Sequence, residues 1–239
     1  MLWEAAMKIC GLQKMTLLDY PGKVACTVFL GGCNFRCPFC HNSELLDGTA
    51  QPLMKQEEFL SFLVRRRGLL DAVCISGGEP TLQPELPALL EQVKRMGFLT
   101  KLDTNGSRPE VLRELISREL LDYIAMDIKN SPALYGHTAG TELPLDRIEE
   151  SIRILTEEKV DYEFRTTVVE QLHSTDSVRQ MGEWVSDLAG GKKIKRWFVQ
   201  PFADRDTVAF EGLFAPDDSQ LTNFVGILRQ FSLHSDQRG

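Results

Sequence analysis

Short apolar runs alternate with longer segments of helical periodicity along this chain. The runs are rich in β-branched and aromatic residues, and we predict six strands, at residues 24–30, 72–76, 100–103, 123–128, 162–169 and 196–200. Between them, apolar residues recur every three or four positions, which predicts helices near residues 55–67, 86–96, 110–119, 145–158, 177–188 and 217–231. This alternation favours parallel strands covered by helices.

Six strand–helix units are fewer than the eight of a closed barrel, so the predicted α/β fold is an open, partial (β/α)6 barrel. We expect the barrel over residues 23–215, an N-terminal extension over residues 1–22, and a C-terminal helix and tail of the same domain over residues 216–239. The polar tail after Phe231 is expected to fray. With 239 residues, 43% of them hydrophobic, the chain can bury a substantial core.

Charge and termini exclude several functional classes. The net charge of −7 argues against a nucleic-acid binder, and no apolar run reaches the roughly 18–20 residues of a membrane span. The N-terminus lacks the basic region and apolar core of a signal peptide, and Met7 could serve as the natural start as well as Met1. Free thiols and the absence of an export signal indicate the cytoplasm. We interpret Cys10, Cys26 and Cys74 as small buried hydrophobic residues.

The most informative segment is a loop with three cysteines, Cys33, Cys37 and Cys40, in the spacing C-x3-C-x2-C. A four-iron cluster held by three thiolates leaves one iron open to a reactant. Pro38 and the glycines before Cys33 suit a backbone that wraps closely around such a cluster. A zinc site would need a matched fourth ligand, and His41, adjacent to Cys40, is poorly placed to share one tetrahedral metal.

Polar motifs follow three of the predicted strands, at the carboxyl ends where parallel α/β folds place their active sites. The first is Gly-Gly-Glu at residues 77–79, in which Glu79 could bind an ammonium group or simply belong to an ordinary turn. Asp103 and Asn105 follow the next strand. Asp127 and Lys129 could form a salt bridge, or with Asp103 flank a small cation and a carboxylate-bearing ligand.

Together these residues resemble the radical S-adenosylmethionine (SAM) superfamily, and within it the glycyl-radical-enzyme activases. The cysteines match the family's cluster motif, and Phe39 matches an aromatic position beside the adenine. By this resemblance the SAM-binding residues are Phe39, Gly77, Gly78, Glu79, Asp103, Asn105, Lys129 and Arg165. It also implies a monovalent cation bound by Asp103, Asp127 and the backbone carbonyls of Thr104 and Ala125. Arg165 could equally form a salt bridge within the barrel.

The resemblance implies a [4Fe-4S] cluster and SAM as cofactors, with a monovalent cation beside them. It also implies that the reduced cluster cleaves SAM and that the resulting 5′-deoxyadenosyl radical takes a hydrogen atom from a glycine of a large partner, a glycyl radical enzyme. The electron would come from a donor such as flavodoxin or ferredoxin. The chain is most similar to the activating proteins of anaerobic ribonucleoside-triphosphate reductase, although it lacks the cysteine-rich insertion of longer activases.

Other functions remain open at this stage. The partner could be pyruvate formate-lyase or a related glycyl radical enzyme. The chain could instead be a radical SAM enzyme that acts on a peptide or a small metabolite, or a metal-binding scaffold without catalytic activity.

Overall fold

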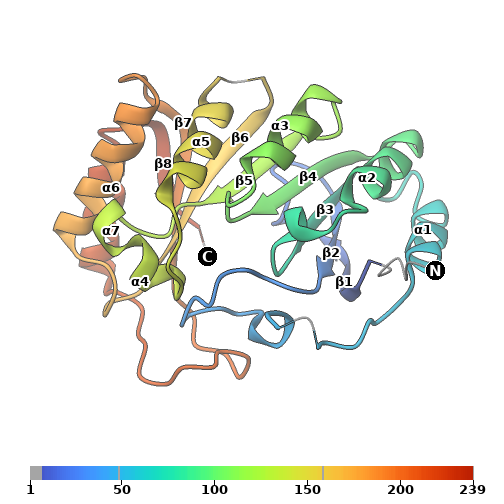
Figure 1. The fold of residues 1–239 in the computed structure, drawn as a ribbon, viewed down its shortest axis with the longest axis horizontal. Helices are drawn as coiled ribbons and strands as arrows, with labels where there is room; N and C mark the ends of the chain where they lie inside the picture. Colours follow the sequence, from blue (N-terminus) through green and yellow to red (C-terminus); the bar gives the residue numbers. More distant parts are fainter. Residues whose placement is uncertain (1–6, 48, 158, 239) are drawn as a thin grey trace. The chain divides into compact units, whose positions relative to one another are not determined.

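The fold is built on one mostly parallel β-sheet. The computed structural model describes residues 7–47, 49–157 and 159–238, so residues 1–6 of the expected N-terminal extension, Met1 included, lie outside the described residues. In this part of the chain eight strands follow one another in the sheet in their sequence order (Figure 1). β1 is antiparallel to β2, whereas β2–β3, β3–β4, β6–β7 and β7–β8 pair in parallel. The α/β class is therefore confirmed.

The helices alternate with the strands as predicted, and every predicted strand and helix is present within a few residues of its expected ends. The strands are β1 (Ile9–Thr16), β2 (Ala25–Leu30), β3 (Ala72–Gly77), β4 (Leu99–Thr104), β5 (Tyr123–Asp127), β6 (Asp161–Val168), β7 (Ile194–Pro201) and β8 (Ser232–Gln237). The α-helices are α1 (Gln56–Val64), α2 (Leu86–Arg95), α3 (Pro109–Ser117), α4 (Tyr135–Ala139), α5 (Leu145–Thr156), α6 (Thr175–Leu188) and α7 (Asp218–Leu228). Single 3-10 turns are η1 (Ser43–Leu45), η2 (Pro80–Leu82) and η3 (Pro132–Leu134). None of the described helices is long and apolar enough to cross a membrane.

The chain divides into two compact units. Unit 1 comprises the chain up to Asn34, Glu44–Thr104 and Glu110–Ile124, and unit 2 comprises Phe35–Ser43, Asn105–Pro109 and the chain from Ala125 onward. The two units therefore share the cysteine loop, and they also share strand β5, which begins in unit 1 and ends in unit 2.

Unit 1 holds a small core at the amino-terminal ends of its strands. Ala25 on β2, Ala72 and Cys74 on β3 and Tyr123 on β5 pack with Tyr20, and the two tyrosine rings lie 5.6 Å apart. The small side chains of alanine and cysteine leave room for the two tyrosine rings in this core. Burial of this layer fixes the register of β2, β3 and β4 and hence the positions of their carboxyl ends.

Unit 2 is stabilised by helices with well-defined starts. Ser174 caps α6 by accepting a hydrogen bond from the Ser177 amide, and Asp217 caps α7 by accepting one from the Gln220 amide. α7 contacts α6 as well as β7 and β8 (Figure 1). The indole of Trp197, fully buried on β7, donates to the Thr166 hydroxyl on β6.

Two strands lie outside the six that we predicted. The tail after Phe231 does not fray: residues 232–237 form β8, which pairs in parallel with β7, and Ser232 and Ser235 are buried with their hydroxyls hydrogen-bonded to each other. The expected N-terminal extension contains β1, which pairs with β2. Both segments carry polar residues at positions where a strand predicted from apolar alternation needs hydrophobic ones.

The cysteines outside the loop are mostly hydrophobic in character, as predicted. Cys26 and Cys74 are fully buried, whereas Cys10 is half-buried and its thiol donates to the Lys8 carbonyl. Burial raises the pKa of both buried thiols, so they are neutral at physiological pH.

Replacing Arg238 with methionine is expected to lower the free energy of unfolding by about 2–3 kcal/mol, because it removes the guanidinium from a buried carboxylate. Arg238 Nη1 lies 2.5 Å from Glu163 Oε1, and the Glu163 side chain is 0% exposed. The same guanidinium stacks 3.6 Å from the centre of the Phe198 ring. Urea unfolding of the iron-free protein measures the loss.

The matched control is Arg95→Met. Arg95 forms an exposed ion pair with Glu91, and its side chain is 73% exposed, so the control should change stability by less than about 0.5 kcal/mol. Equal effects of the two substitutions would show that the Arg238–Glu163 pair contributes no more than an exposed ion pair does.

Candidate functional site

The cysteine loop follows β2, and each half is held by backbone hydrogen bonds within its own unit. In unit 1 the Gly32 amide donates to the Leu45 carbonyl at 2.7 Å, and the Cys33 amide donates to the Leu46 carbonyl at 3.1 Å. These bonds anchor the start of the loop to η1. Cys33 is thereby fixed one short step beyond a buried strand.

The second half of the loop belongs to unit 2 and is held by the end of α4. The Arg36 amide donates to the Ala139 carbonyl at 2.9 Å, and the Cys37 thiol lies 3.6 Å from the same oxygen. Gly140 has φ +65°, and a Cβ there would lie 1.9 Å from the Arg36 carbonyl oxygen, so the close approach requires glycine. The Cys40 amide donates to the Cys37 carbonyl at 3.1 Å, which closes a tight turn.

The three loop thiols suit an iron–sulfur cluster in their chemistry. Cys33, Cys37 and Cys40 are half-buried, and none of the three forms a disulfide. Burial raises the pKa of the Cys37 and Cys40 thiols, and the nearby Lys129 ammonium acts in the opposite direction by favouring the thiolates. Among the described residues no three Cys, His, Asp or Glu side chains converge as an ion site. The fit therefore rests on the kind and spacing of the sulfur donors.

His41 has a different role, as its position beside Cys40 indicated. Its Nε2 lies 2.7 Å from the Ala203 carbonyl, and its ring stacks on Phe202 with the ring centres 5.8 Å apart. Phe39 packs against Phe202 and Val169 in the same apolar cluster. This cluster ties the second half of the loop to the segments that follow β6 and β7.

The Gly-Gly-Glu motif packs against the start of the cysteine loop within unit 1. Gly77 has φ +121°, and a Cβ there would lie 2.3 Å from the Leu30 backbone. A Cβ on Gly78 would lie 2.1 Å from the Gly32 carbonyl oxygen. The close approach that these glycines permit is thus to the chain leaving β2, and the Glu79 amide donates to the same Gly32 oxygen at 2.8 Å.

Glu79 is a buried carboxylate in a fixed orientation. It is 1% exposed, and its Oε1 accepts hydrogen bonds from the Thr81 amide at 3.1 Å, the Thr81 hydroxyl at 2.5 Å and the Thr104 hydroxyl at 2.8 Å. A carboxylate held in a fixed orientation by hydrogen bonds is suited to bind an ammonium group. The sequence did not single out Thr81. Thr81 stands two residues after Glu79, and Glu79 caps the short helical turn η2 by accepting from the Thr81 amide.

Asp103 at the end of β4 is paired with a residue that the sequence analysis did not select. The Nζ of Lys101 lies 2.5 Å from Asp103 Oδ1, and the Lys101 side chain is only 1% exposed. Residues two apart on a strand point to the same face, which explains the contact. Asn105 is buried as well, and its side-chain oxygen accepts from the Ser107 amide at 2.9 Å, which closes the turn after β4.

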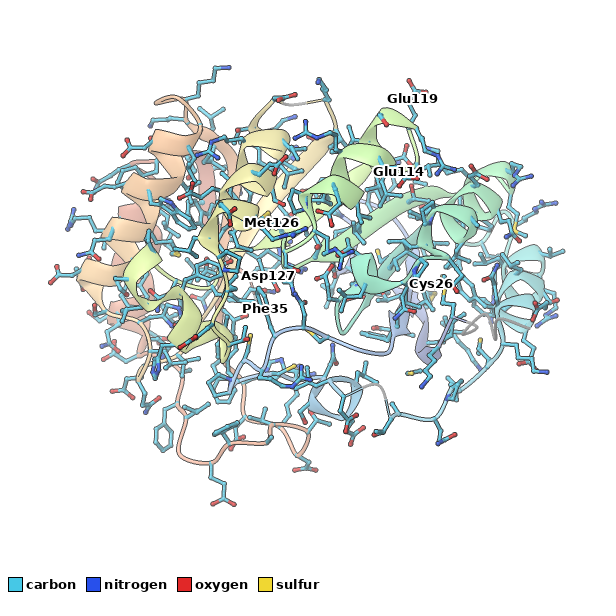
Figure 2. The ribbon with its side chains drawn as sticks, in the orientation of Figure 1. Cys26, Phe35, Glu114, Glu119, Met126 and Asp127 are labelled. Carbon is cyan, nitrogen blue, oxygen red and sulfur yellow. The ribbon has the colours of Figure 1, made fainter. Side chains whose placement is uncertain are left out.

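At the end of β5, Asp127 (labelled in Figure 2) is held by two cations. The Nζ of Lys129 lies 3.0 Å from its Oδ2, and the Nε of Arg165 lies 3.1 Å from its Oδ1. Burial alone would raise the pKa of Asp127, but the two cations outweigh it and hold the pKa at about 2. Both salt bridges that the sequence left open are therefore formed, and Lys129 also lies 5.8 Å from the centre of the Phe39 ring.

His173 is a further buried residue that the sequence analysis missed. It is 4% exposed, and its Nε2 lies 2.8 Å from the Lys129 carbonyl, while its Nδ1 lies 3.1 Å from the Val169 amide. Burial lowers the pKa of this imidazole, which keeps it neutral. The neutral ring links the chain after β6 to the backbone of Lys129. This contact fixes the backbone position from which the Lys129 side chain extends.

The residues expected around a monovalent cation do not fit a bound ion well. Asp103 is neutralised by Lys101, and Asp127 is neutralised by Lys129 and Arg165, in each case within one unit. Thr104 and Ala125, expected to offer their backbone carbonyls, are both buried. A cation site at these four residues therefore stays a prediction, with its negative charge already balanced by protein groups.

The low pKa of Asp127 predicts a specific acid sensitivity. A carboxyl whose pKa falls from its ordinary value near 4 to about 2 on folding stabilises the protein above pH 4, and this stabilisation is lost as the pH falls from about 4 to 2. The contribution is about 2 kcal/mol. Asp127→Asn should therefore show a smaller loss of stability over that window in urea unfolding of the iron-free protein. Parallel pH profiles for wild type and variant would contradict the ion-pair geometry.

Comparison with known proteins identifies a family. The sequence profile of the Radical SAM superfamily matches residues 27–175, which contain the cysteine loop, Glu79, Asp103 and Asp127. A candidate glycyl-radical enzyme activating enzyme of Methanocaldococcus jannaschii is 30% identical over 233 residues, covering 93% of this chain and 92% of that protein. The pyruvate formate-lyase 1-activating enzyme of Escherichia coli strain K12 is 26% identical, covering 94% of this chain and 96% of that enzyme.

Solved structures agree at the level of the fold. A domain of pyruvate-formate lyase-activating enzyme from Bacteroides vulgatus superposes with a TM-score of 0.58 at 20% identity, over 70% of this chain and 99% of that one. Streptococcus suis SuiB superposes with a TM-score of 0.67 at 16% identity, over 87% of this chain and 47% of that one. The family implies an enzyme with a [4Fe-4S] cluster and SAM, which the three free thiols suit. With a profile match over more than half its length and a relative at 30% identity over nearly all of it, the chain belongs to the radical SAM superfamily.

Proposed function

We propose that this chain is an activase that installs a glycyl radical on a large partner enzyme, most closely an anaerobic ribonucleoside-triphosphate reductase. The observation that carries the proposal is that the relatives matching over 93–94% of this chain are named for activation of glycyl radical enzymes or of pyruvate formate-lyase. A further pyruvate formate-lyase-activating enzyme, from Clostridium pasteurianum, matches over 52% of this chain. The 7-carboxy-7-deazaguanine synthase of Thermococcus kodakarensis, a relative named for a small-molecule product, matches over only 54%. A small-metabolite enzyme is therefore the second candidate.

The proposal assigns a role to each part of the site. Cys33, Cys37 and Cys40 hold the cluster, and Glu79 binds the methionine ammonium of SAM as a buried, hydrogen-bonded carboxylate. Lys129 brings a positive charge toward the loop thiols and the methionine carboxylate. When bound, the reduced cluster and SAM supply a one-electron cleavage that yields methionine and a 5′-deoxyadenosyl radical able to take a hydrogen atom.

The remaining proposed contacts orient SAM and exclude water. Phe39 lies in an apolar cluster suited to cover the adenine, and Asn105 stiffens the turn after β4. Gly77 and Gly78 keep the Glu79 turn close to the cysteine loop. Arg165, already paired with Asp127, holds that carboxylate in place at the end of β5. Orientation matters here because a reactive radical must meet its target within a few ångströms.

A macromolecular substrate and an electron donor complete the proposal. The partner supplies the glycine, and a carrier such as flavodoxin or ferredoxin supplies the electron. The free thiols suit a reducing compartment, so we place the enzyme in the cytoplasm.

Electron paramagnetic resonance tests the assignment. Reconstituted, reduced protein is mixed with SAM and a candidate glycyl radical enzyme, and we expect the doublet of a glycyl radical. A partner whose radical-site glycine is changed to alanine should give no doublet. SAM cleavage without a doublet from any candidate partner, but with turnover of a small metabolite, would favour the second candidate.

A further inference from the structure

Lys101 is a buried cation that the proposed function does not use. It lies in the middle of β4, its side chain is 1% exposed, and its Nζ is 2.5 Å from Asp103 Oδ1. Desolvating an ammonium is costly unless a charged partner compensates. The pair joins two residues of the same strand, so it links no separate elements of the fold.

The surroundings of Lys101 form a polar row inside unit 1. The sheet register aligns Thr27 on β2 with Cys74 on β3, and Cys74 with Lys101 on β4. The Thr27 hydroxyl donates to Asp19 Oδ2 at 2.5 Å. Cys74 is a neutral thiol in this row, so the negative charge nearest to Lys101 in its own strand is that of Asp103.

A hydrophobic side chain at position 101 would serve packing at least as well. Replacing a buried ion pair by apolar groups is often neutral or stabilising, so a retained ion pair is weak support for a purely structural role. Lys101 instead places a positive charge beside Asp103 at the end of β4, and the family resemblance makes Asp103 a SAM-binding residue. A second carboxylate, that of the methionine in SAM, can approach Asp103 only if a positive charge lies between or beside them.

We propose that Lys101 is the built-in cation of the cofactor site: its ammonium neutralises and positions Asp103, and thereby replaces the monovalent ion that the family resemblance implies at Asp103, Thr104, Ala125 and Asp127. This inference rests on membership of the radical SAM superfamily and on the SAM-binding role that the family resemblance implies for Asp103, and it does not depend on the identity of the protein partner. Lys101 is a positioning residue, because its observed contact is with Asp103. The ion pairs around Asp127 neutralise the other expected ligand in the same way.

The wild-type protein provides the first test. SAM binding to the reconstituted protein is measured in about 0.1 M potassium chloride and in the same concentration of tetramethylammonium chloride, so that ionic screening is equal. Tetramethylammonium is too large to sit between two carboxylates. We expect the two dissociation constants to agree within about twofold, a difference of less than half a kcal/mol. A requirement for potassium or sodium in wild type would overturn the proposal.

Lys101→Met provides the second test, because methionine keeps the length of the side chain and removes the charge. In tetramethylammonium chloride this variant should bind SAM at least about tenfold more weakly than wild type, and potassium or sodium chloride should restore most of the loss. Lys94→Met is the matched control: Lys94 pairs with Asp122 at 2.8 Å, but its side chain is 30% exposed, so this variant should bind SAM like wild type in both salts.

Thermal unfolding of the iron-free protein gives a readout that is independent of activity. In Lys101→Met the Asp103 carboxylate lacks its ammonium, so potassium or sodium should raise the unfolding midpoint more than tetramethylammonium does. Wild type and the double variant Lys101→Met/Asp103→Asn should show no such preference. If Lys101→Met shows no cation-specific effect on either SAM binding or unfolding, Lys101 is not the cation of this site. If the salt responses are as expected but no glycyl radical forms on the partner, the result counts against the proposed partner. The role of Lys101 then still stands.

Discussion

Replacing Cys37 with alanine is expected to abolish SAM cleavage and to lower the iron content of the reconstituted protein. Three thiolates are the fewest that hold a four-iron cluster with one open iron, so losing one removes both the cluster and the reaction. Cys37 is half-buried beside the end of α4, and no other free cysteine lies in the loop of unit 2 except Cys40, which already has its own place in the motif. The measurements are iron per chain, the absorbance of the cluster, and the yield of 5′-deoxyadenosine.

Cys26→Ala is the matched control. Cys26, labelled in Figure 2, is a fully buried free cysteine on β2, the strand that leads into the loop. Its replacement removes a sulfur atom from the core and should cost about 1 kcal/mol of stability while iron content and SAM cleavage are retained. If Cys37→Ala kept full iron content and turnover, the loop would not be the cluster site.

Replacing Glu79 with glutamine is expected to weaken SAM binding about 100-fold, which corresponds to about 2.7 kcal/mol. The substitution keeps the size of the side chain and the possibility of hydrogen bonds with Thr81 and Thr104, so the loss reports the negative charge itself. A buried carboxylate that binds an ammonium contributes far more than an exposed one, because water screens it little. Equilibrium binding under anaerobic conditions measures the effect, with cluster content as the check that the loop is intact.

Glu114→Gln is the control for this substitution. Glu114 lies on α3, and its side chain is 48% exposed and paired with Arg118, so SAM binding should not change. Binding to Glu79→Gln within a few-fold of wild type would remove Glu79 from the ammonium site, and its three hydrogen bonds would then serve only to hold the turn.

The fold class could be predicted because apolar residues dominate the central strands. Most positions of β2 and β3 are buried, so their continuous hydrophobic runs can be recognised in the sequence without knowing the strand register. β8 could not be predicted in this way. Its inward-facing residues are Ser232 and Ser235, whose burial depends on hydroxyl hydrogen bonds that only the folded sheet provides. β1 is paired with β2 but has exposed residues at its far end, so it lacks a clear alternation.

The residues of the candidate site also fall into those that the sequence could select and those that it could not. The loop cysteines and Glu79 stand in compact motifs directly after strands and Asp127 ends β5, so the sequence could select them as candidates. Lys101 was not, since a lysine within a strand is usually solvent-exposed and only the register of β3 and β4 shows that it is buried. The hydrogen bond from the Thr104 hydroxyl to Glu79 could not be predicted either, because it joins residues 25 positions apart and no local pattern encodes it.

The central claim is that this enzyme takes a hydrogen atom from a glycine of a partner protein, and isotope transfer tests it most directly. The partner is produced with glycine deuterated at the α-carbon, mixed with reduced, reconstituted enzyme and SAM, and the 5′-deoxyadenosine is analysed by mass spectrometry. We predict one deuterium in 5′-deoxyadenosine, in an amount that matches the glycyl radical formed, and none when the radical-site glycine of the partner is replaced by alanine. Formation of 5′-deoxyadenosine without deuterium, at the same rate with and without each partner, would contradict the proposed function.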